Sequence, residues 1–139
     1  MRGHLMNRFD DAGKLILRLT VGLLMLSHGL HKLIHGIDGI SALVVTNGWP
    51  SALAFGVYVG EIVAPALVIL GVLTRPAALI VVFNMLIAIY LAHSHQLFQL
   101  TKTGGWFLEL QGFFLFGALC VALLGAGKFS LAGTRGRFN

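Results

Sequence analysis

Residues 19–36 of the chain read LTVGLLMLSHGLHKLIHG, an apolar run that ends in three histidines and one lysine. The apolar pattern starts earlier, after Asp10 and Asp11, whose carboxylates suit the cap and first turn of a helix. A helix from about 11 to 33 is long enough to cross a hydrocarbon core of about 30 Å, which takes roughly 20 residues. Because no small-x-small cleavage site follows the run, we expect a retained membrane helix and not a secretory signal.

The composition of the chain favours a membrane protein. Among 139 residues, 57% are hydrophobic and 11% are charged, and the mean hydropathy is +0.87. Three more apolar stretches lie at about 52–73, 77–92 and 106–124. Inside lipid every backbone amide needs an internal partner, and the chain shows no alternating strand pattern, so these stretches should be helices. We predict one all-α domain over residues 1–139, folded as a four-helix transmembrane bundle.

The connections between these stretches predict how the helices are arranged. The turn 74–76, with Pro76 near a helix start, is so short that the helices on either side must be antiparallel neighbours. Residues 36–51 are too few and too broken to span, so we expect a short interfacial segment with Trp49 among the headgroups. The link at about 94–105 is expected to be polar.

The basic residues predict the orientation. Seven lysines and arginines lie near the N-terminus, in the turn 74–76 and in the C-terminal tail, whereas the opposite loops hold only Lys32 and Lys102. The positive-inside rule then places both termini in the cytoplasm, for a protein of a bacterial-type inner (plasma) membrane. Because the basic residues are scattered singly at helix ends, the net charge of +5 does not indicate a nucleic-acid partner.

Glu61 is the first candidate functional residue, because a carboxylate near the middle of a membrane span is costly unless it is paired, protonated or hydrated. Gly56 and Gly60 precede it at a spacing that lets another helix approach closely. Pro65 cannot donate a hydrogen bond to the carbonyl of Glu61, so we expect a kink there. Two interpretations stay open: a functional carboxylate, or an ion pair with the first or fourth helix that only fixes packing.

Three other polar residues fall in or near the spans. Glu109, near the outer start of the fourth helix, is either a pocket residue or an acid that favours the helix dipole. Arg18, about two turns from the cytoplasmic end, either snorkels or makes an inward polar contact. Asn84, in mid-span, is expected to hydrogen-bond across helices and serve packing.

The histidines of the opening run raise the question of a metal site. At about 100° per residue, His28, His31 and His35 share one helix face, but His28 and His35 are roughly 10 Å apart along the axis. That distance is too large for all three to bind one zinc ion in an intact helix, so we predict no metal site. Proton handling, headgroup contact and interfacial packing are the other interpretations. The alternative metal set combines residues of two regions: His28, His31, His93 and His95.

The chain has no redox centre of its own. Its single cysteine, Cys120, has no partner for a disulfide or a CxxC pair, and a c-type haem attachment motif is absent. No nucleophile motif is present. We therefore leave open whether the protein is an enzyme, expect at most an oxidoreductase subunit, and predict no built-in cofactor.

Four local patterns, in order along the chain, resemble the DoxX family of small four-helix membrane proteins. They are LRLTVGLLMLSHGLHKL at 17–33, Gly60-Glu61 followed by GVLTRPAAL at 71–79, His93, and GAGKFSL at 125–131. Where the family usually has Asp after the last Ser-Leu, this chain has Ala132, so no role is carried over to that position. The positions that match the family pattern are Arg18, His28, Lys32, Glu61, Arg75 and His93.

The resemblance implies a redox setting, since some relatives are described as membrane subunits of thiosulfate:quinone oxidoreductases and others as membrane partners of oxidative-stress and thiol-redox proteins. We therefore expect an accessory protein of a redox or sulfur-related system, with a polar pocket open to the outer face and a quinone as candidate cofactor. Candidate partners are the lipid bilayer, redox proteins and a second copy of the chain. A proton-linked transporter component and a membrane assembly or chaperone-like protein stay as alternatives. The pocket candidates are Glu61, His28, Lys32, His93, Glu109 and Arg18.

Overall fold

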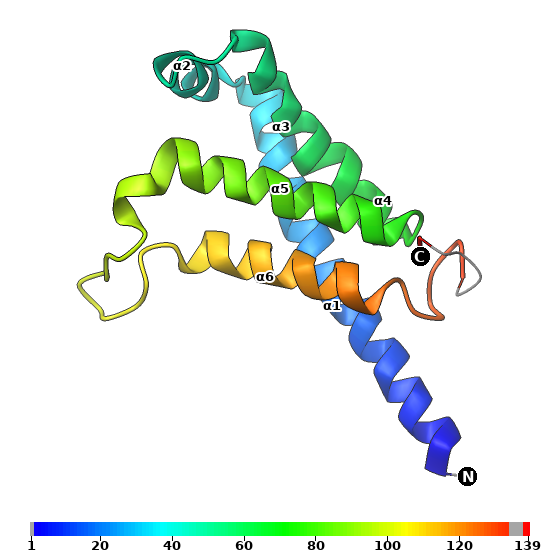
Figure 1. Cartoon of the computed structure of the whole chain (residues 1–139). Helices are drawn as coiled ribbons and strands as arrows, with labels where there is room; N and C mark the ends of the chain where they lie inside the picture. The colour runs from blue at the N-terminus through cyan, green and yellow to red at the C-terminus, as the bar shows by residue number, and fades with distance from the viewer. Residues whose placement is uncertain (1, 134–137) are drawn as a thin grey trace.

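The computed structural model describes residues 2–133 and 138–139, with side chains from Phe9 onward (Figure 1). In this part of the chain every regular element is helical, and the single bridge, between Leu100 and Trp106, is isolated. The predicted all-α class is confirmed.

Within the described residues, three helices are long and apolar enough to cross a membrane. Helix α1 covers Arg2–His35, and its candidate membrane span is Phe9–His35. The second is the continuous helical run Ser51–Leu70, and the third is Thr74–Gln96, most of which is α5, Thr74–His93. Helix α6, Glu109–Leu124, is apolar but has only 16 residues. The length and composition of these helices support a membrane protein.

Helix α1 begins earlier than the sequence predicts. It starts at Arg2 and passes through Asp10 and Asp11 without a break. Asp10 pairs with Lys14 one turn later, at 2.9 Å, and Asp11 accepts a hydrogen bond from the backbone N–H of Lys128, at 3.0 Å. The predicted capping role of the two aspartates is wrong, because both lie inside the helix. Asp10 is paired with Lys14, and Asp11 is bonded to the backbone of Lys128.

A short helix, α2, Asp38–Thr46, follows α1. Its Val44 packs with Ile37 and Ala54 in a small apolar cluster. Trp49, just after α2, stacks on Tyr90 of α5, with ring centroids 5.9 Å apart and planes at 18°. The short segment predicted between the first two helices is thus helical and contacts α5. Its position at the membrane interface stays a prediction.

The run Ser51–Leu70 changes its helical geometry near Glu61. Pro65 has no N–H for the carbonyl of Glu61, so the regular hydrogen-bond ladder cannot pass this point, and a π-turn accommodates the gap. The sequence predicts a kink here, and the structure has a π-helical turn, Val59–Val63. In order, the run consists of the 3-10 helix η1, Ser51–Phe55, then α3, Gly56–Tyr58, the π-helix η2, Val59–Val63, and α4, Ala64–Leu70.

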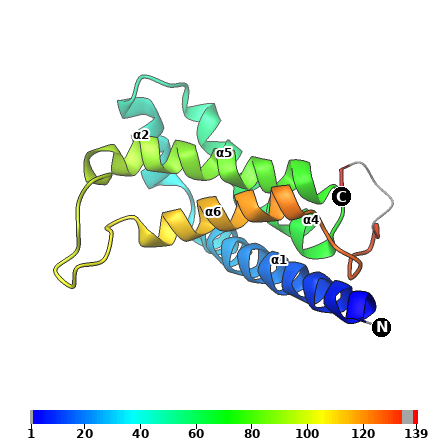
Figure 2. The same cartoon turned by 60° about the horizontal axis from the view of Figure 1, so that its bottom comes forward.

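The long helices pack on a shared apolar core. Helix α5 lies along α6, and α1 packs against both α4 and α6 (Figures 1 and 2). A tight turn joins α4 to α5, and Gly71 takes the left-handed conformation there, at φ 71°. Small residues at the centre, such as Ala78 and Ala118, are fully buried and let the helices approach closely.

Residues 125–133 form a C-terminal strap that packs against α1 near Asp11 and against the end of α4. The N–H of Leu131 donates to the carbonyl of Leu70, at 3.0 Å. Together with the contact between Lys128 and Asp11, this bond ties the end of α6 to α1 and α4.

Candidate functional site

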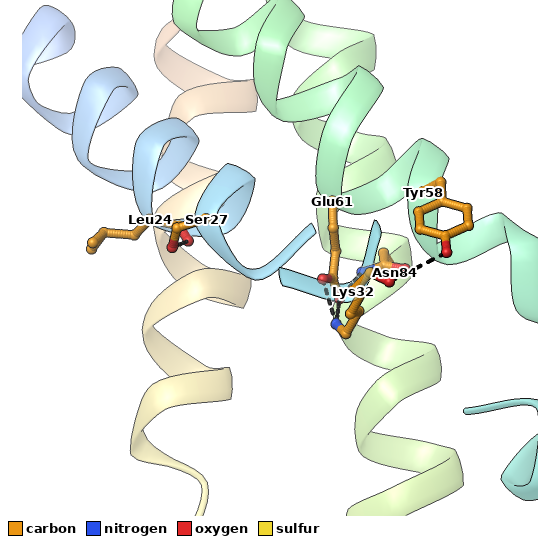
Figure 3. A network of polar contacts seen from close by, with 6 residues as sticks. All are labelled: Leu24, Ser27, Lys32, Tyr58, Glu61 and Asn84. Atoms are coloured by element: carbon orange, nitrogen blue, oxygen red, sulfur yellow. Dashed lines mark hydrogen bonds and ion pairs between the residues drawn. The ribbon is translucent and has the colours of Figure 1, made fainter. Parts of the chain in front are cut away.

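A lysine–glutamate pair joins α1 to the π-helical turn η2. Lys32 Nζ donates to both carboxylate oxygens of Glu61 and forms an ion pair with it (Figure 3). The side chain of Glu61 is 5% exposed, whereas that of Lys32 is 27% exposed. Because burial of an unpaired charge costs on the order of several kcal/mol, the lysine is what makes this carboxylate tolerable. The carboxylate of the pair is therefore buried, whereas its ammonium group is partly accessible.

Two more residues complete this polar cluster. Asn84 of α5 donates from Nδ2 to Glu61 Oε1 at 3.5 Å, and the Tyr58 hydroxyl donates to the backbone carbonyl of Lys32 at 3.5 Å (Figure 3). Both contacts are long for hydrogen bonds, so each is weak. We call Lys32, Tyr58, Glu61 and Asn84 the Glu61 cluster; it joins α1, the run Ser51–Leu70 and α5.

Two glycines allow the helices to come this close. An added Cβ at Gly29 would lie against the carbonyl group of Glu61, and one at Gly60 would lie against the side chain of Asn84. Gly56, in contrast, has nothing within 4 Å. Of the predicted glycine pair only Gly60 serves close packing, and the contact with α1 depends on Gly29.

The pair has a defined capacity for hydrogen bonding. A lysine ammonium carries three donors, and Glu61 takes two of those on Lys32, so one N–H remains for a ligand. The pair is neutral overall and offers no net charge to attract an anion. A neutral oxygen acceptor therefore suits it better than an inorganic anion.

His28 lies one turn before Lys32 on the same side of α1. Its side chain is exposed, and its ring meets that of Phe114 in α6 edge-on, with centroids 5.6 Å apart and planes at 90°. Phe114 is itself buried in the core, so the ring of His28 is the exposed member of this pair.

His93, the last residue of α5, contacts Gln96 three residues later and Gln111 of α6. Its Nδ1 is 2.7 Å from Gln96 Oε1, and its Nε2 is 3.2 Å from Gln111 Nε2. An amide oxygen accepts and an amide nitrogen donates, so this arrangement suits a ring with its proton on Nδ1. The hydrogen bonds of His93 thus hold the ends of two helices together.

Arg18 lies at the other end of the molecule and is 2% exposed. Its Nη1 donates to the carbonyl of Ala126 at 2.6 Å, and its Nη2 to that of Phe129 at 2.7 Å. All five acidic residues of the chain have described side chains, and none pairs with Arg18. It therefore makes an inward contact, with backbone carbonyls of the strap. Lys32 is roughly 21 Å further along the helix axis, so Arg18 is not part of the Glu61 cluster.

Helix ends compensate the charge of Arg18. An added Cβ on Gly71, the residue that ends α4, would be 2.7 Å from Nη1, and Ala126 directly follows Gly125, which ends α6. Each helix C-terminus carries a partial negative charge of roughly half an electron. Two such ends around one guanidinium provide the counter-charge that no carboxylate supplies.

The remaining candidates are spread over the surface. Glu109 is exposed in the first turn of α6, where its carboxylate lies over Gly105. His31 and His35 stack on each other at the end of α1, with centroids 4.1 Å apart, and His95 is exposed in the 3-10 helix η3, Ser94–Gln96. Among the described residues, no three His, Cys, Asp or Glu side chains are grouped so that they could hold a metal ion.

Sequence reasoning missed Tyr58 and Gly29 as neighbours of Glu61. Tyr58 precedes Glu61 by three residues, a spacing that puts both on one helix face. Gly29 follows Gly22 by two helical turns, and an added Cβ at Gly22 would meet Ile69, at 2.5 Å. Two glycines at this spacing are a sequence signal for a closely packed face.

The chain is similar to known proteins over more than half of its length. The chain is 30% identical over 84 residues to the protein named "Putative oxidoreductase CatD" of Bacillus subtilis (strain 168); the match covers 60% of this chain and 62% of that protein. No solved structure matches the chain. The family model DoxX matches residues 13–94, which include Lys32, Glu61 and Asn84. The chain therefore belongs to the DoxX family.

Proposed function

We propose that the chain is a membrane-embedded subunit of a quinone-linked redox system, in which the Glu61 cluster contacts a quinone headgroup. The observation that carries the proposal is the Lys32–Glu61 pair, buried at the carboxylate and accessible at the ammonium. The name of the Bacillus relative, an oxidoreductase, supports a redox setting.

A quinone suits the cluster better than an anion such as thiosulfate. A quinone carbonyl is a neutral acceptor for the remaining N–H of Lys32, and a charged donor makes that hydrogen bond strong. The exposed ring of His28, one helical turn from Lys32, offers a place for a quinone ring. An anion at the remaining N–H of Lys32 would lie close to the carboxylate of Glu61, and the two negative charges would repel each other.

In this proposal the chain binds and orients the quinone, and a partner redox protein exchanges the electrons. A bound quinone supplies the redox chemistry itself, while the protein supplies donors and an apolar environment. Cys120, exposed on α6, is the one cysteine of the chain. A redox protein in the membrane or at its surface is therefore the expected partner, and self-association of the chain is compatible with this role.

We further propose a four-helix bundle in a bacterial inner membrane with both termini in the cytoplasm. Support comes from the packing of α1, α4, α5 and α6 on one core and from the excess of lysine and arginine near the strap and the α4–α5 turn. In this orientation Lys32 lies near the outer end of α1. The accessible side of the Glu61 cluster then belongs to the outer half of the membrane.

The test is binding of a short-chain quinone to the purified protein in lipid nanodiscs. We expect Lys32→Met to bind it at least about tenfold more weakly, since the loss of one charged hydrogen bond is worth about 1.4 kcal/mol or more. Glu61→Gln should also bind it more weakly, because the carboxylate no longer holds the ammonium in place. Lys14→Met is the matched control, because it makes the same change on the same helix, at a lysine paired with Asp10.

Equal quinone affinity in the Lys32, Glu61 and Lys14 variants would exclude the Glu61 cluster as the ligand site. Thiosulfate provides the second arm of the test. We expect it not to displace the quinone, and displacement that depends on Lys32 would show that the site takes anions.

A proton-linked transporter component is the second candidate, and one observation favours it. Glu61 lies in the π-helical turn η2, and interrupted helices at mid-membrane are where transporters hold ions and substrates. Proteoliposomes with an internal pH dye provide the test. A faster, Glu61-dependent decay of an imposed pH gradient would support transport, and decay equal to that of empty liposomes would remove this candidate.

A further inference from the structure

The hairpin that connects α5 to α6, residues 97–107, exposes large apolar side chains. Phe98 is 98% exposed, Leu100 69% and Phe107 41%. The sequence pattern predicts a polar link at this position, and exposure of such side chains to water costs about 25 cal/mol per Å². The apolar exposure continues into the first turns of α6, where Leu110 and Phe113 are exposed. The hairpin surface is therefore unlike that of a loop in water.

The hairpin also satisfies much of its own backbone. A loop in water can leave its amides to solvent, but a loop close to hydrocarbon needs internal partners for them. Four hydrogen bonds close the hairpin. The backbone N–H of Thr101 donates to the carbonyl of Gly105 at 2.8 Å, and that of Gly104 to the carbonyl of Thr101 at 3.0 Å. The N–H of Phe107 donates to the carbonyl of Gln99 at 3.0 Å, and Trp106 Nε1 donates to the carbonyl of Leu97 at 2.8 Å.

Charge in the hairpin is confined to its tip. Lys102 is the one charged residue of the segment 97–107, and it is exposed beside Thr103 and Gly104. A lysine at the surface of an anionic membrane gains about 1 kcal/mol, whereas an acidic residue would be repelled. The hairpin thus combines an apolar body with a cationic, polar tip.

Helix α6 is too short to cross a bilayer by itself. Its 16 residues rise roughly 24 Å, compared with a hydrocarbon core of about 30 Å. The hairpin projects beyond the ends of α5 and α6, as Figures 1 and 2 show. It therefore extends the apolar surface of α6 in the direction in which the helix falls short.

We propose that the hairpin 97–107 is a membrane-interface anchor. Phe98, Leu100 and Phe107 lie at the boundary between lipid headgroups and acyl chains, and Lys102 reaches the lipid phosphates. The anchor sets the depth of α6, which would otherwise thin the bilayer around it. It also holds the α5–α6 end of the molecule, where His93 contacts Gln111, at the membrane surface.

The test is a single tryptophan at position 98 in proteoliposomes, made as Phe98→Trp in a chain with Trp49→Phe and Trp106→Phe. Phospholipids with a doxyl quencher at a shallow or a deep acyl position report its depth. We expect stronger quenching by the shallow label, a blue-shifted emission and weak quenching by aqueous iodide. The matched control is Lys128→Trp in the same background, at an exposed strap residue, which iodide should quench and lipid labels should not.

The native Trp106 in the Trp49→Phe chain is a second probe that leaves the hairpin sequence unchanged, and we expect the same preference for the shallow label. Iodide quenching at position 98 as strong as at position 128, without an effect of the lipid labels, would overturn the proposal and indicate a surface for a protein partner. Strongest quenching by the deep label would also overturn it, because the hairpin would then lie inside the hydrocarbon.

Discussion

Glu61 is stable in its place because one nearby cation neutralises it. Its side chain is 5% exposed, and Lys32 bonds both of its oxygens. Removal of one partner from a buried pair typically costs about 3–5 kcal/mol, whereas replacement of both by uncharged groups is often nearly neutral. Asn84, at 3.5 Å, makes too weak a contact to replace the ammonium.

Lys32→Met should lower the free energy of unfolding by about 3 kcal/mol, because it leaves the buried carboxylate of Glu61 unpaired. Glu61→Gln should lower it by less, because the ammonium of Lys32 is partly accessible. The double variant should lose clearly less than the sum of the two. Unfolding by heat or by SDS in mixed micelles measures this double-mutant cycle. Strictly additive losses would contradict a direct pair. Lys14→Met, whose partner Asp10 is exposed, should cost less than about 1 kcal/mol.

Arg18 is stabilised differently, since its hydrogen-bond partners are backbone carbonyls of the strap. Arg18→Met removes two charged hydrogen bonds, each worth about 1.5–3 kcal/mol, and should release the strap. We expect faster tryptic cleavage after Lys128 and unchanged quinone binding. Arg18→Lys should restore the protection only in part, because an ammonium cannot bond both carbonyls in a planar fork. Cleavage at the wild-type rate in Arg18→Met would contradict this role.

At the scale of helices, the Glu61 cluster depends on the close approach of α1 and the run Ser51–Leu70. Pro65 leaves the carbonyl of Glu61 without its regular donor, and the turn widens to a π-helix. Gly29 fits against that same carbonyl because it has no side chain. The π-helical turn in one helix and the glycine in the other therefore meet at the same place, the carbonyl of Glu61.

Gly29→Ala should destabilise the protein by about 1–3 kcal/mol, because the new methyl group would meet backbone atoms that cannot move independently. It should also separate Lys32 from Glu61 and weaken quinone binding. Gly13→Ala, on the same helix with nothing within 4 Å, is the control and should be neutral or stabilising by up to about 1 kcal/mol. Thermal unfolding of both variants measures the difference, and equal melting temperatures for Gly29→Ala and Gly13→Ala would contradict the close packing at Gly29.

At the scale of the whole molecule, the proposed orientation places the hairpin 97–107 outside and the strap inside. With Cys120→Ala as background, Lys102→Cys should react with a membrane-impermeant maleimide in intact cells. Lys128→Cys should react only after the cells are permeabilised. Labelling of Lys128→Cys from outside, with Lys102→Cys protected, would show the opposite orientation.

The sequence predicted the helical class and three of the four proposed spans as helices long and apolar enough to cross a membrane, because these depend on local composition. It also singled out Glu61, a carboxylate inside an apolar run, and the resemblance to the DoxX family added Lys32. It misplaced the start of α1. An aspartate that caps a helix and an aspartate within a helix that accepts a bond from the backbone of Lys128 look the same in the local sequence.

Other features were decided only by tertiary structure. The partners of Arg18 are carbonyl groups of Ala126 and Phe129, and every residue has a carbonyl, so no side-chain pattern could reveal them. Likewise, the sequence names Lys32 and Glu61 as candidates for one pocket, but the direct bond from Lys32 to both carboxylate oxygens depends on how closely Gly29 lets two helices approach. Local chemistry therefore determined which segments are apolar helices and which residues carry charge, and the packing of those helices determined which charges meet.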